Sequence, residues 1–304
     1  MRDLKRQVAM HYPDLGAVEA RLAYSSVHDM VEVRAGGDRY ALKLYRPGVR
    51  TVDDVQWEAA FHRHLLDNGA PVAPIVTGAS GDVETIEVDG VPRLAVLSSW
   101  APGRKPSASE GAYRLVGRAA AQIHAAAESF SSERDRPPRD LTTELHEQLA
   151  LLRPALELVG RWDAALSLGE RIEEFVSSHQ LERGICHNDL TLDNVHVEGD
   201  RITVFDLDSA TECWRASEPQ GVFHWAQLSG GPWWDAWQAG YGEVRTMAAQ
   251  DLASVPWFVL LFQFENAAWK LGLTATSIGP LITVDDLGTL VDWWGGWAHV
   301  HCRR

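Results

Sequence analysis

The 304-residue chain has little positive charge, few cysteines and no long apolar run, and each shortage excludes a class of protein. Its 28 Lys and Arg residues stand against 42 Asp and Glu residues, a formal net charge of −14, which argues against nucleic acid or an anionic membrane as a partner. Its three cysteines are too few and too scattered for a disulfide framework. Without a run of about 18 apolar residues, no transmembrane helix is expected.

The remaining composition is that of an ordinary soluble protein. Hydrophobic residues make up 45% and charged residues 23% of the chain, and its length allows one large domain or two lobes around a cleft. The opening residues lack the apolar core of a secretion signal, so we expect a cytoplasmic location. The acidic balance is compatible with a cationic substrate and equally with a merely soluble surface.

The first hundred residues read as a small β-rich lobe. Alternation of apolar and polar residues predicts one hairpin over 30–45 and a second over 83–97, the latter joined by Asp89-Gly90. Side chains on a strand repeat every two residues, so Ala41 and Lys43 share a face. The small Ala41 therefore leaves room for a ligand beside Lys43.

A helix is predicted between the two hairpins. Thr51 is a candidate N-cap, and the helix should reach about Asp67 and carry Glu58. After the second hairpin, Pro and Gly residues indicate an inter-lobe linker over 98–103. Beyond it, apolar residues at helical spacing predict helices over 110–130, 143–158, 164–179, 233–241, 252–271 and 284–297. We therefore expect an α/β (α+β) chain with a β-rich N-lobe over 1–97 and a helical C-lobe over 104–304.

The most informative stretch, residues 185–210, reads ICHNDLTLDNVHVEGDRITVFDLDSA. It contains H-x-D-L-x-x-x-N, then a turn and a β-rich run ending in D-L-D. Phosphoryl transfer from ATP needs a carboxylate to orient the attacking hydroxyl and accept its proton, and oxygen ligands to hold Mg²⁺ on the phosphates. Asp189 offers the first, and Asn194 and Asp206 offer the second, at the spacing of a kinase catalytic loop and metal motif. The stretch predicts a kinase.

These motifs lack the Arg of a protein-kinase H-R-D and the final Gly of D-F-G. The chain therefore resembles the small-molecule branch of the protein-kinase-like fold, the aminoglycoside phosphotransferase and choline kinase family, from about Arg21 to Leu273. Within that family, ALKLYRPG (41–48) and VFDLDSA (204–210) are similar to the bacterial stress-response Ser/Thr kinases. That subgroup is thought to act on protein hydroxyls.

The resemblance implies a two-lobed fold whose N-lobe binds the nucleotide and whose C-lobe carries the catalytic loop and the acceptor site. Lys43 is expected on the α- and β-phosphates, fixed by Glu58. The resemblance also implies contacts to the β-phosphate from Ser25 and Ser26, and to adenine from the linker residues Ser98, Ser99 and Trp100.

ATP and Mg²⁺ are the expected cofactors. Asn194 and Asp206 should ligate Mg²⁺, and Asp189 should act as the catalytic base or hydroxyl-orienting group. Asp208 has two interpretations, as a ligand of a second metal ion or water, or as a hydrogen-bonding residue of the loop. His187 is expected to support the loop backbone and not to serve as the base.

The chain departs from the family pattern in three places. It has no G-x-G-x-x-G between the first strands, so the phosphate-covering loop is weakly marked. Many family members carry Asp-Leu-Ala past the metal motif to brace the catalytic loop, but here residues 222–226 read VFHWA, so another residue must serve. Asn188 stands where glycine is commonest, and Asn is among the best substitutes if that position has an unusual backbone conformation.

The acceptor remains open at this stage. A small hydroxylated molecule, such as an aminoglycoside, another antibiotic, a sugar or an amino alcohol, is favoured as the wider family's habit. The rival acceptor is a Ser or Thr of a protein, or of a peptide in a modification pathway with a separate lyase, which would add a protein partner. A third reading is a pseudokinase that binds nucleotide without catalysis. Retention of Lys43, Asp189, Asn194 and Asp206 argues against it.

Overall fold

The computed structural model describes residues 2–302, which form two compact units. The first unit comprises the chain up to residue 106 together with residues 126–136 and 194–208. The second comprises residues 107–125, 137–193 and the chain from residue 209 onward. The β-rich first unit and the mostly helical second unit confirm the predicted two-lobed, kinase-like fold class.

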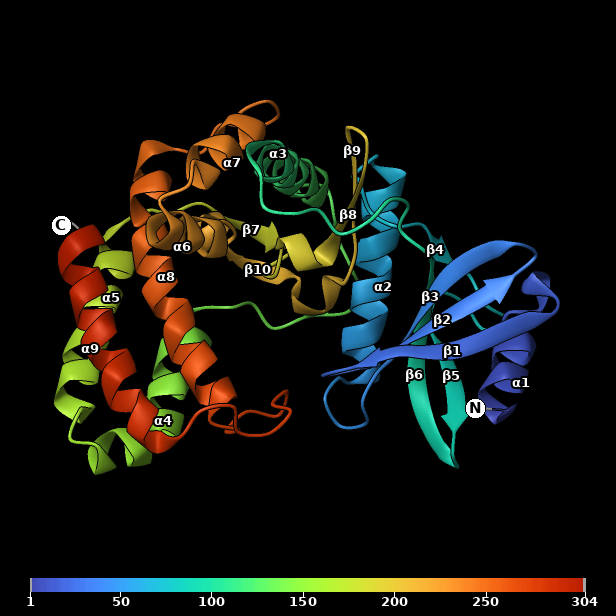
Figure 1. Ribbon diagram of the computed structural model, residues 1–304, viewed down its shortest axis with the longest axis horizontal. Helices are drawn as coiled ribbons and strands as arrows, with labels where there is room; N and C mark the ends of the chain where they lie inside the picture. The colour runs from blue at the N-terminus through green and yellow to red at the C-terminus, as the bar shows by residue number, and fades with distance from the viewer. Residues whose placement is uncertain (1, 303–304) are drawn as a thin grey trace. The chain divides into compact units, whose positions relative to one another are not determined.

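A six-stranded antiparallel sheet is the centre of the first unit (Figure 1). Its order is β1-β2-β3-β6-β4, and β5 also pairs with β6. The strands are β1 (Val18–Ser25), β2 (Asp29–Ala35), β3 (Asp38–Leu44), β4 (Ile75–Val76), β5 (Glu84–Val88) and β6 (Val91–Ser99). Both predicted hairpins are present, β2–β3 and β5–β6. The second turns at Asp89-Gly90, whose positive φ angles of 51° and 78° fit a tight two-residue turn.

Each face of this sheet packs against one helix. Helix α1 (Arg2–His11) places Leu4 and Val8 in a core with Val31, Leu42 and other buried residues of the sheet. Helix α2 (Val52–Asp67) packs Val55 and Ala59 against the opposite face, where Val96 lies. The predicted N-cap is confirmed, because Thr51 and Asp54 form a complete capping box. The sheet face that carries Lys43 is therefore the one next to α2, since Lys43 pairs with Val96.

A small hairpin from later in the chain completes the first unit. Strands β8 (Val195–Glu198) and β9 (Arg201–Val204) pair antiparallel, and Val204 bridges to Val72. The backbone N–H of Val204 donates to Pro71 O at 2.7 Å, and Val204 O accepts from Ala73 N at 3.0 Å. This hairpin brings the segments on either side of it, with Asn194 and Asp206, into the same unit as Lys43.

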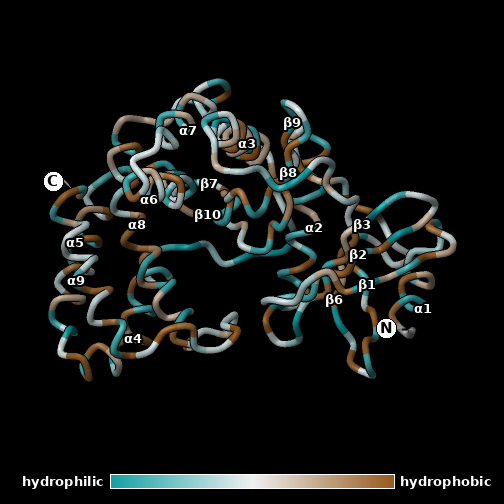
Figure 2. The backbone as a smooth tube through the Cα atoms, in the orientation of Figure 1, coloured by the Kyte–Doolittle hydropathy of each residue, from teal (hydrophilic) through white to brown (hydrophobic). Residues whose placement is uncertain are grey.

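The second unit is built around α8 (Ala249–Lys270), most of whose residues are buried. The other helices are α3 (Glu110–Ala127), α4 (Glu147–Leu158), α5 (Trp162–Ser178), α6 (Gln220–Ser229), α7 (Trp233–Tyr241) and α9 (Val284–His301). Figure 2 shows the apolar stretches along α3 and α8. Strands β7 (Arg183–Cys186) and β10 (Thr211–Trp214) form an antiparallel pair, and the catalytic motif follows β7 directly. No helix in residues 2–302 meets the length and apolarity needed to span a bilayer.

Candidate active site

Lys43 is the centre of a buried charge cluster in the first unit. Its ammonium Nζ lies 2.8 Å from Asp206 Oδ1, 3.2 Å from Glu58 Oε1 and 3.6 Å from Asp208 Oδ1. The side chain of Lys43 is only 9% exposed, and that of Glu58 only 8%. The structure thus brings Lys43 and Glu58 together with the D-L-D motif, which lies more than a hundred residues later in the sequence.

One ammonium shared by three carboxylates sets the protonation of this cluster. Burial disfavours a charged Lys43, but Asp206, Asp208 and Glu58 outweigh it and hold its pKa well above the usual value. Burial raises the pKa of Glu58, because Lys43 compensates it only in part while Asp206 and Asp208 compete for the same ammonium. Lys43 is therefore a fixed positive charge, suited to hold phosphate oxygens.

The residues predicted to hold Mg²⁺ flank the β8–β9 hairpin. Asn194 precedes β8, Asp206 follows β9, and the N–H of Phe205 donates to Asn194 O at 3.1 Å, which ties the two ends together. Asp206 has a positive φ of 64°, a conformation rare for a non-glycine residue and typical of functional positions. Its side chain keeps 30% exposure. An amide and a carboxylate oxygen in this setting fit a hard divalent cation.

Asp208 lies in a strongly cationic surrounding. Besides Lys43, it contacts His28 and Arg50, and Arg136 donates to its main-chain oxygen. Burial acts against ionisation, yet Lys43, His28 and Arg50 hold the pKa of Asp208 well below its usual range. Sequence reasoning missed His28, Arg50 and Arg136, because none belongs to a motif and all are brought to Asp208 by the tertiary fold.

The other predicted nucleotide contacts lie at the sheet's ends. Ser25 ends β1 and its hydroxyl donates to Asp29, while the N–H of Ser26 donates to His28 O at 3.0 Å, so the turn is internally bonded. At the end of β6, Ser98 pairs with Ala41. The backbone N–H groups of the next two residues also donate hydrogen bonds. That of Ser99 donates to Pro74 O at 2.7 Å and that of Trp100 to Arg39 O at 2.9 Å. The Arg39 guanidinium covers the Trp100 ring at 4.1 Å.

The catalytic loop belongs to the second unit. His187 is fully buried, whereas Asp189, two residues on, is exposed. Asn188 between them has a φ of +63°, the conformation for which Asn is a good replacement of Gly. Its side-chain Nδ2 donates to Ser209 O at 3.2 Å, so the amide also links the loop to the segment before β10. His187 Nδ1 accepts from the N–H of Asp189 at 3.3 Å, the structural role expected for this histidine.

Glu218 supports this loop by accepting hydrogen bonds from its backbone. Its Oε2 accepts the N–H of His187 at 2.7 Å and its Oε1 accepts the N–H of Asn188 at 3.2 Å. His124 of α3 donates through Nε2 to Oε2 at 3.3 Å, with its Nδ1 3.0 Å from the hydroxyl of Tyr241. Glu218 thus fills the role left open by the missing Asp-Leu-Ala, and it lies four residues before VFHWA. The only sign of this role in the sequence was the absence of Asp-Leu-Ala.

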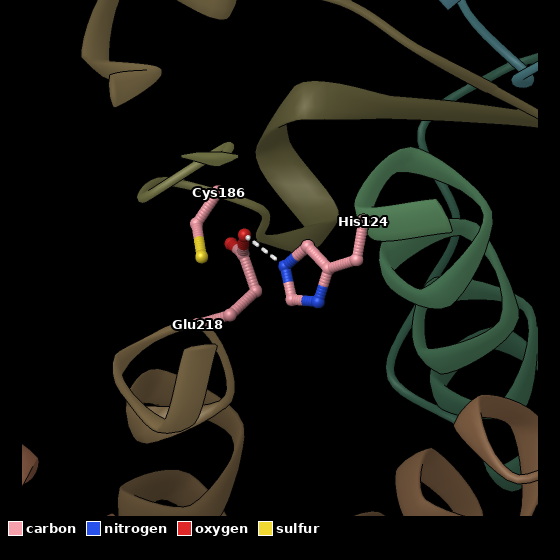
Figure 3. Close-up of side chains that lie close together, drawn as sticks. All are labelled: His124, Cys186 and Glu218. Carbon is pink, nitrogen blue, oxygen red and sulfur yellow. Dashed lines mark hydrogen bonds and ion pairs between the residues drawn. The ribbon is translucent and has the colours of Figure 1, made fainter. Parts of the chain in front are cut away.

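His124, Cys186 and Glu218 lie close enough for their ligand atoms to bind one metal ion (Figure 3). Both oxygens of Glu218 are already acceptors for backbone N–H groups of the catalytic loop. Burial, together with Cys213 and Glu218, raises the pKa of the Cys186 thiol well above its usual value, so the thiolate that a metal needs is disfavoured. We interpret the cluster as a hydrogen-bonded brace. Cys186 is a small and fully buried residue.

A pocket in the second unit reaches the catalytic loop at Asn188. Arg139 lies in its wall, 2.5 Å from Glu144 and also paired with Glu265, so one cation is shared by two carboxylates. The remaining lining is partly aromatic, and the residues include Cys213, Trp214, Ser217, Gln220, Phe258, Leu261 and Phe262. Burial raises the pKa of Glu144 to about 7 despite the opposing effect of Arg139, so this carboxyl is only partly ionised near neutral pH. The aromatic faces are surfaces on which a cation can bind.

Comparison with known proteins agrees with this geometry. The model of the phosphotransferase enzyme family matches residues 24–256. An uncharacterized protein of Deinococcus radiodurans is 31% identical over 264 residues, covering 82% of this chain and 75% of that protein.

Two solved structures show the same fold. An amicoumacin kinase in complex with AMP-PNP, Ca²⁺ and Ami aligns with a TM-score of 0.74 at 20% identity, over 97% of this chain and 92% of its own. A microcompartment-associated aminopropanol kinase aligns with a TM-score of 0.71 at 23% identity, over 96% and 94%. The chain therefore belongs to the phosphotransferase enzyme family and is a phosphotransferase that acts on a hydroxyl-bearing acceptor.

Proposed function

We propose that the protein is an ATP- and Mg²⁺-dependent kinase. The observation that carries this proposal is the buried Lys43 ammonium, held 3.2 Å from Glu58 and 2.8 Å from Asp206. Lys43 would bind phosphate oxygens of the nucleotide, steadied by Glu58. Asn194 and Asp206 would hold Mg²⁺, which when bound supplies charge neutralisation at the phosphates. A complex of a structurally similar kinase with AMP-PNP and Ca²⁺ supports a nucleoside triphosphate and a divalent cation.

Asp189 would be the catalytic residue toward the acceptor. Its carboxylate would orient the acceptor hydroxyl and accept its proton while the oxygen bonds to the γ-phosphorus and the bond to the leaving ADP oxygen breaks. The exposure of Asp189 and the hydrogen bonds from Glu218 to the backbone of the preceding two residues support this role, since the carboxylate must be accessible to a substrate yet fixed in position. Positioning and charge stabilisation would provide most of the rate.

The acceptor we propose is a small hydroxylated amine, such as an amino alcohol or an aminoglycoside-like antibiotic. The pocket wall carries Glu144, which pairs with Arg139, and Trp214 and Phe258 offer aromatic faces for an ammonium group. The two similar structures are an amicoumacin kinase and an aminopropanol kinase, which supports the same class of acceptor here.

The test is to follow labelled phosphate from γ-labelled ATP with Mg²⁺. One arm offers amino alcohols and aminoglycosides together with their deaminated analogues, and the other offers Ser/Thr peptides and lysate. We expect label on the amines and at least a tenfold lower kcat/KM for the analogues, the order of one lost charged contact. Asp189→Asn should lower kcat about 10²-fold or more and leave ATP binding intact.

Each of the following outcomes would contradict one part of the proposed function. Label only in polypeptides would replace the small-molecule acceptor by a protein or peptide Ser/Thr. Full activity of Asp189→Asn would remove the assigned base. ATP binding by the wild-type protein without transfer to any acceptor would indicate a pseudokinase.

A further inference from the structure

Both carboxylate oxygens of Asp208 contact donors of the first unit. Oδ1 accepts from Arg50 Nε at 3.0 Å and lies 3.2 Å from His28 Nε2 and 3.6 Å from Lys43 Nζ. Oδ2 accepts from Arg50 Nη2 at 2.9 Å, so the Arg50 fork is bidentate. The side chain of Asp208 is 15% exposed, half the value of Asp206.

The histidine contact has a defined direction. The backbone N–H of Arg46 donates to His28 Nδ1 at 3.1 Å, so that nitrogen has no proton. In the neutral ring the proton is then on Nε2, which donates to Asp208. His28 is 9% exposed and lies 4.8 Å from the Tyr45 ring, so this orientation is also fixed by packing.

The partners of Asp208 come from separate elements. His28 belongs to the β1–β2 turn that holds Ser25 and Ser26, Lys43 to β3, and Arg50 to the segment just before α2. The main-chain oxygen of Asp208 accepts from Arg50 Nη2 at 3.0 Å and from Arg136, in the first unit's 126–136 segment. One residue therefore ties four separate stretches of chain to the segment that carries Asp206.

We propose that Asp208 is a positioning residue that assembles the nucleotide site, and that metal binding is left to Asn194 and Asp206. This rests on the proposed ATP and Mg²⁺ function. A metal ion at Asp208 would have to displace a bidentate guanidinium from a carboxylate that Lys43 already faces, and it would meet the repulsion of both cations. Asp208 instead holds Lys43 and the β1–β2 turn in the positions that bind phosphates.

The experiment compares Asp208→Asn, Asp206→Asn and wild type as full chains. It measures the affinity for ATP in EDTA and the Mg²⁺ midpoint for metal-dependent ATP binding, both by calorimetry. For Asp208→Asn we expect about tenfold weaker ATP binding in EDTA with a Mg²⁺ midpoint within about twofold of wild type. Asp206→Asn should instead raise the Mg²⁺ midpoint about tenfold or more. Asp38→Asn, at the exposed β2–β3 turn, makes the same charge change and should alter neither quantity.

A tenfold rise of the Mg²⁺ midpoint in Asp208→Asn would overturn the proposal, and so would unchanged ATP binding in EDTA. If Asp208→Asn does not fold, Arg50→Gln and His28→Gln replace it. For both we again expect weaker ATP binding in EDTA and a Mg²⁺ midpoint close to that of wild type. A wild-type protein that binds no nucleotide would refute the proposed function separately.

A double-mutant cycle tests the assembly without any ligand. Asp208→Asn and Arg50→Gln should each lower the urea unfolding midpoint, and the double variant should lose less stability than the sum of the two single losses, because both changes remove the same carboxylate–guanidinium contact. Additive losses would show that the two residues act independently and would overturn the proposal.

Discussion

At the scale of single residues, the catalytic loop depends on two unusual positions. Asn188 has a left-handed backbone conformation. Unlike Gly, it also has a side chain, which donates a hydrogen bond to Ser209 O. Glu218 accepts the two consecutive backbone N–H groups of His187 and Asn188. The exposed Asp189 is thus held through its backbone neighbours, while its own carboxylate remains at the surface.

Glu218→Gln should lower both stability and turnover. Losing the ionised acceptor weakens two buried hydrogen bonds, a cost of about 1–3 kcal/mol in the free energy of unfolding. We expect kcat to fall at least about tenfold with little change in KM for ATP, because the residues proposed to bind the nucleotide lie in the other unit. Steady-state kinetics and urea unfolding measure this, with exposed Glu174→Gln on α5 as control. Equal kcat in both variants would contradict the brace.

The same substitution has a defined pH dependence. Burial raises the pKa of Glu218, but His124 and the backbone N–H of His187 outweigh it, so the folded pKa lies below the usual value. A carboxyl with a lowered folded pKa contributes stability above its unfolded pKa of about 4.3 and loses it as the pH falls through the folded value. The stability difference between wild type and Glu218→Gln should therefore be full near pH 7 and shrink below about pH 4.

The motif residues could be predicted from sequence, and their supports could not. Asp189, Asn194 and Asp206 have a spacing that is itself informative. His28 and Arg50 contact Asp208 across 180 and 158 residues, and neither spacing nor residue type marks them in advance. For the same reason the sequence predicted only that some residue must support the catalytic loop, and it did not identify Glu218.

At the scale of elements, local sequence signals were sufficient where periodicity or capping was strong. The hairpins, α2 with its capping box, α7 and α9 were predicted close to their observed bounds. Helices α1 and α6 and strand β1 were not predicted. Helix α1 is polar over most of its length, and only tertiary packing of Leu4 and Val8 on the sheet stabilises it.

Helices α3 and α7 meet at two glycines, which gives an element-scale prediction. A Cβ on Gly117 would lie 2.0 Å from Trp237 O, and one on Gly240 would lie 1.9 Å from Arg114 O. Because backbone atoms cannot give way, Gly117→Ala should separate the helices and destabilise the protein by about 1–3 kcal/mol. Gly111→Ala, in the same helix with open space around it, should be neutral or stabilising by up to about 1 kcal/mol. Thermal unfolding measures both, and equal midpoints would contradict the close crossing.

At the scale of the molecule, the first unit is assembled from three separate stretches of chain. The sheet is formed by residues before 106, but Val195 and Val204 of the later hairpin are fully buried within the same unit. Lys43 likewise depends on that hairpin's following segment for two of its three carboxylate partners. This interleaving is invisible to window-based sequence patterns, which describe neighbours along the chain only.

A fragment of residues 1–106 should therefore fail to fold cooperatively, although it contains all six strands of the sheet. It would expose the surface that Val204 covers and leave the buried Lys43 with Glu58 as its remaining carboxylate. Urea unfolding followed by the fluorescence of Trp57 and Trp100 should show no cooperative transition, unlike the full chain. A sigmoidal transition with the full chain's midpoint would show that the sheet is independent of the later segments.

The interleaving also sets an order of events during synthesis. The ribosome releases the sheet, with Lys43 and Arg50, well before residues 194–208 exist, and domains usually fold as they emerge. Until then Lys43 has Glu58 as its carboxylate partner and Arg50 lacks Asp208, while about a hundred more residues are made at roughly 5–20 residues per second. The arrival of Asp206 and Asp208 then completes the charge cluster around Lys43 and Arg50, so a half-made chain lacks part of the proposed nucleotide site.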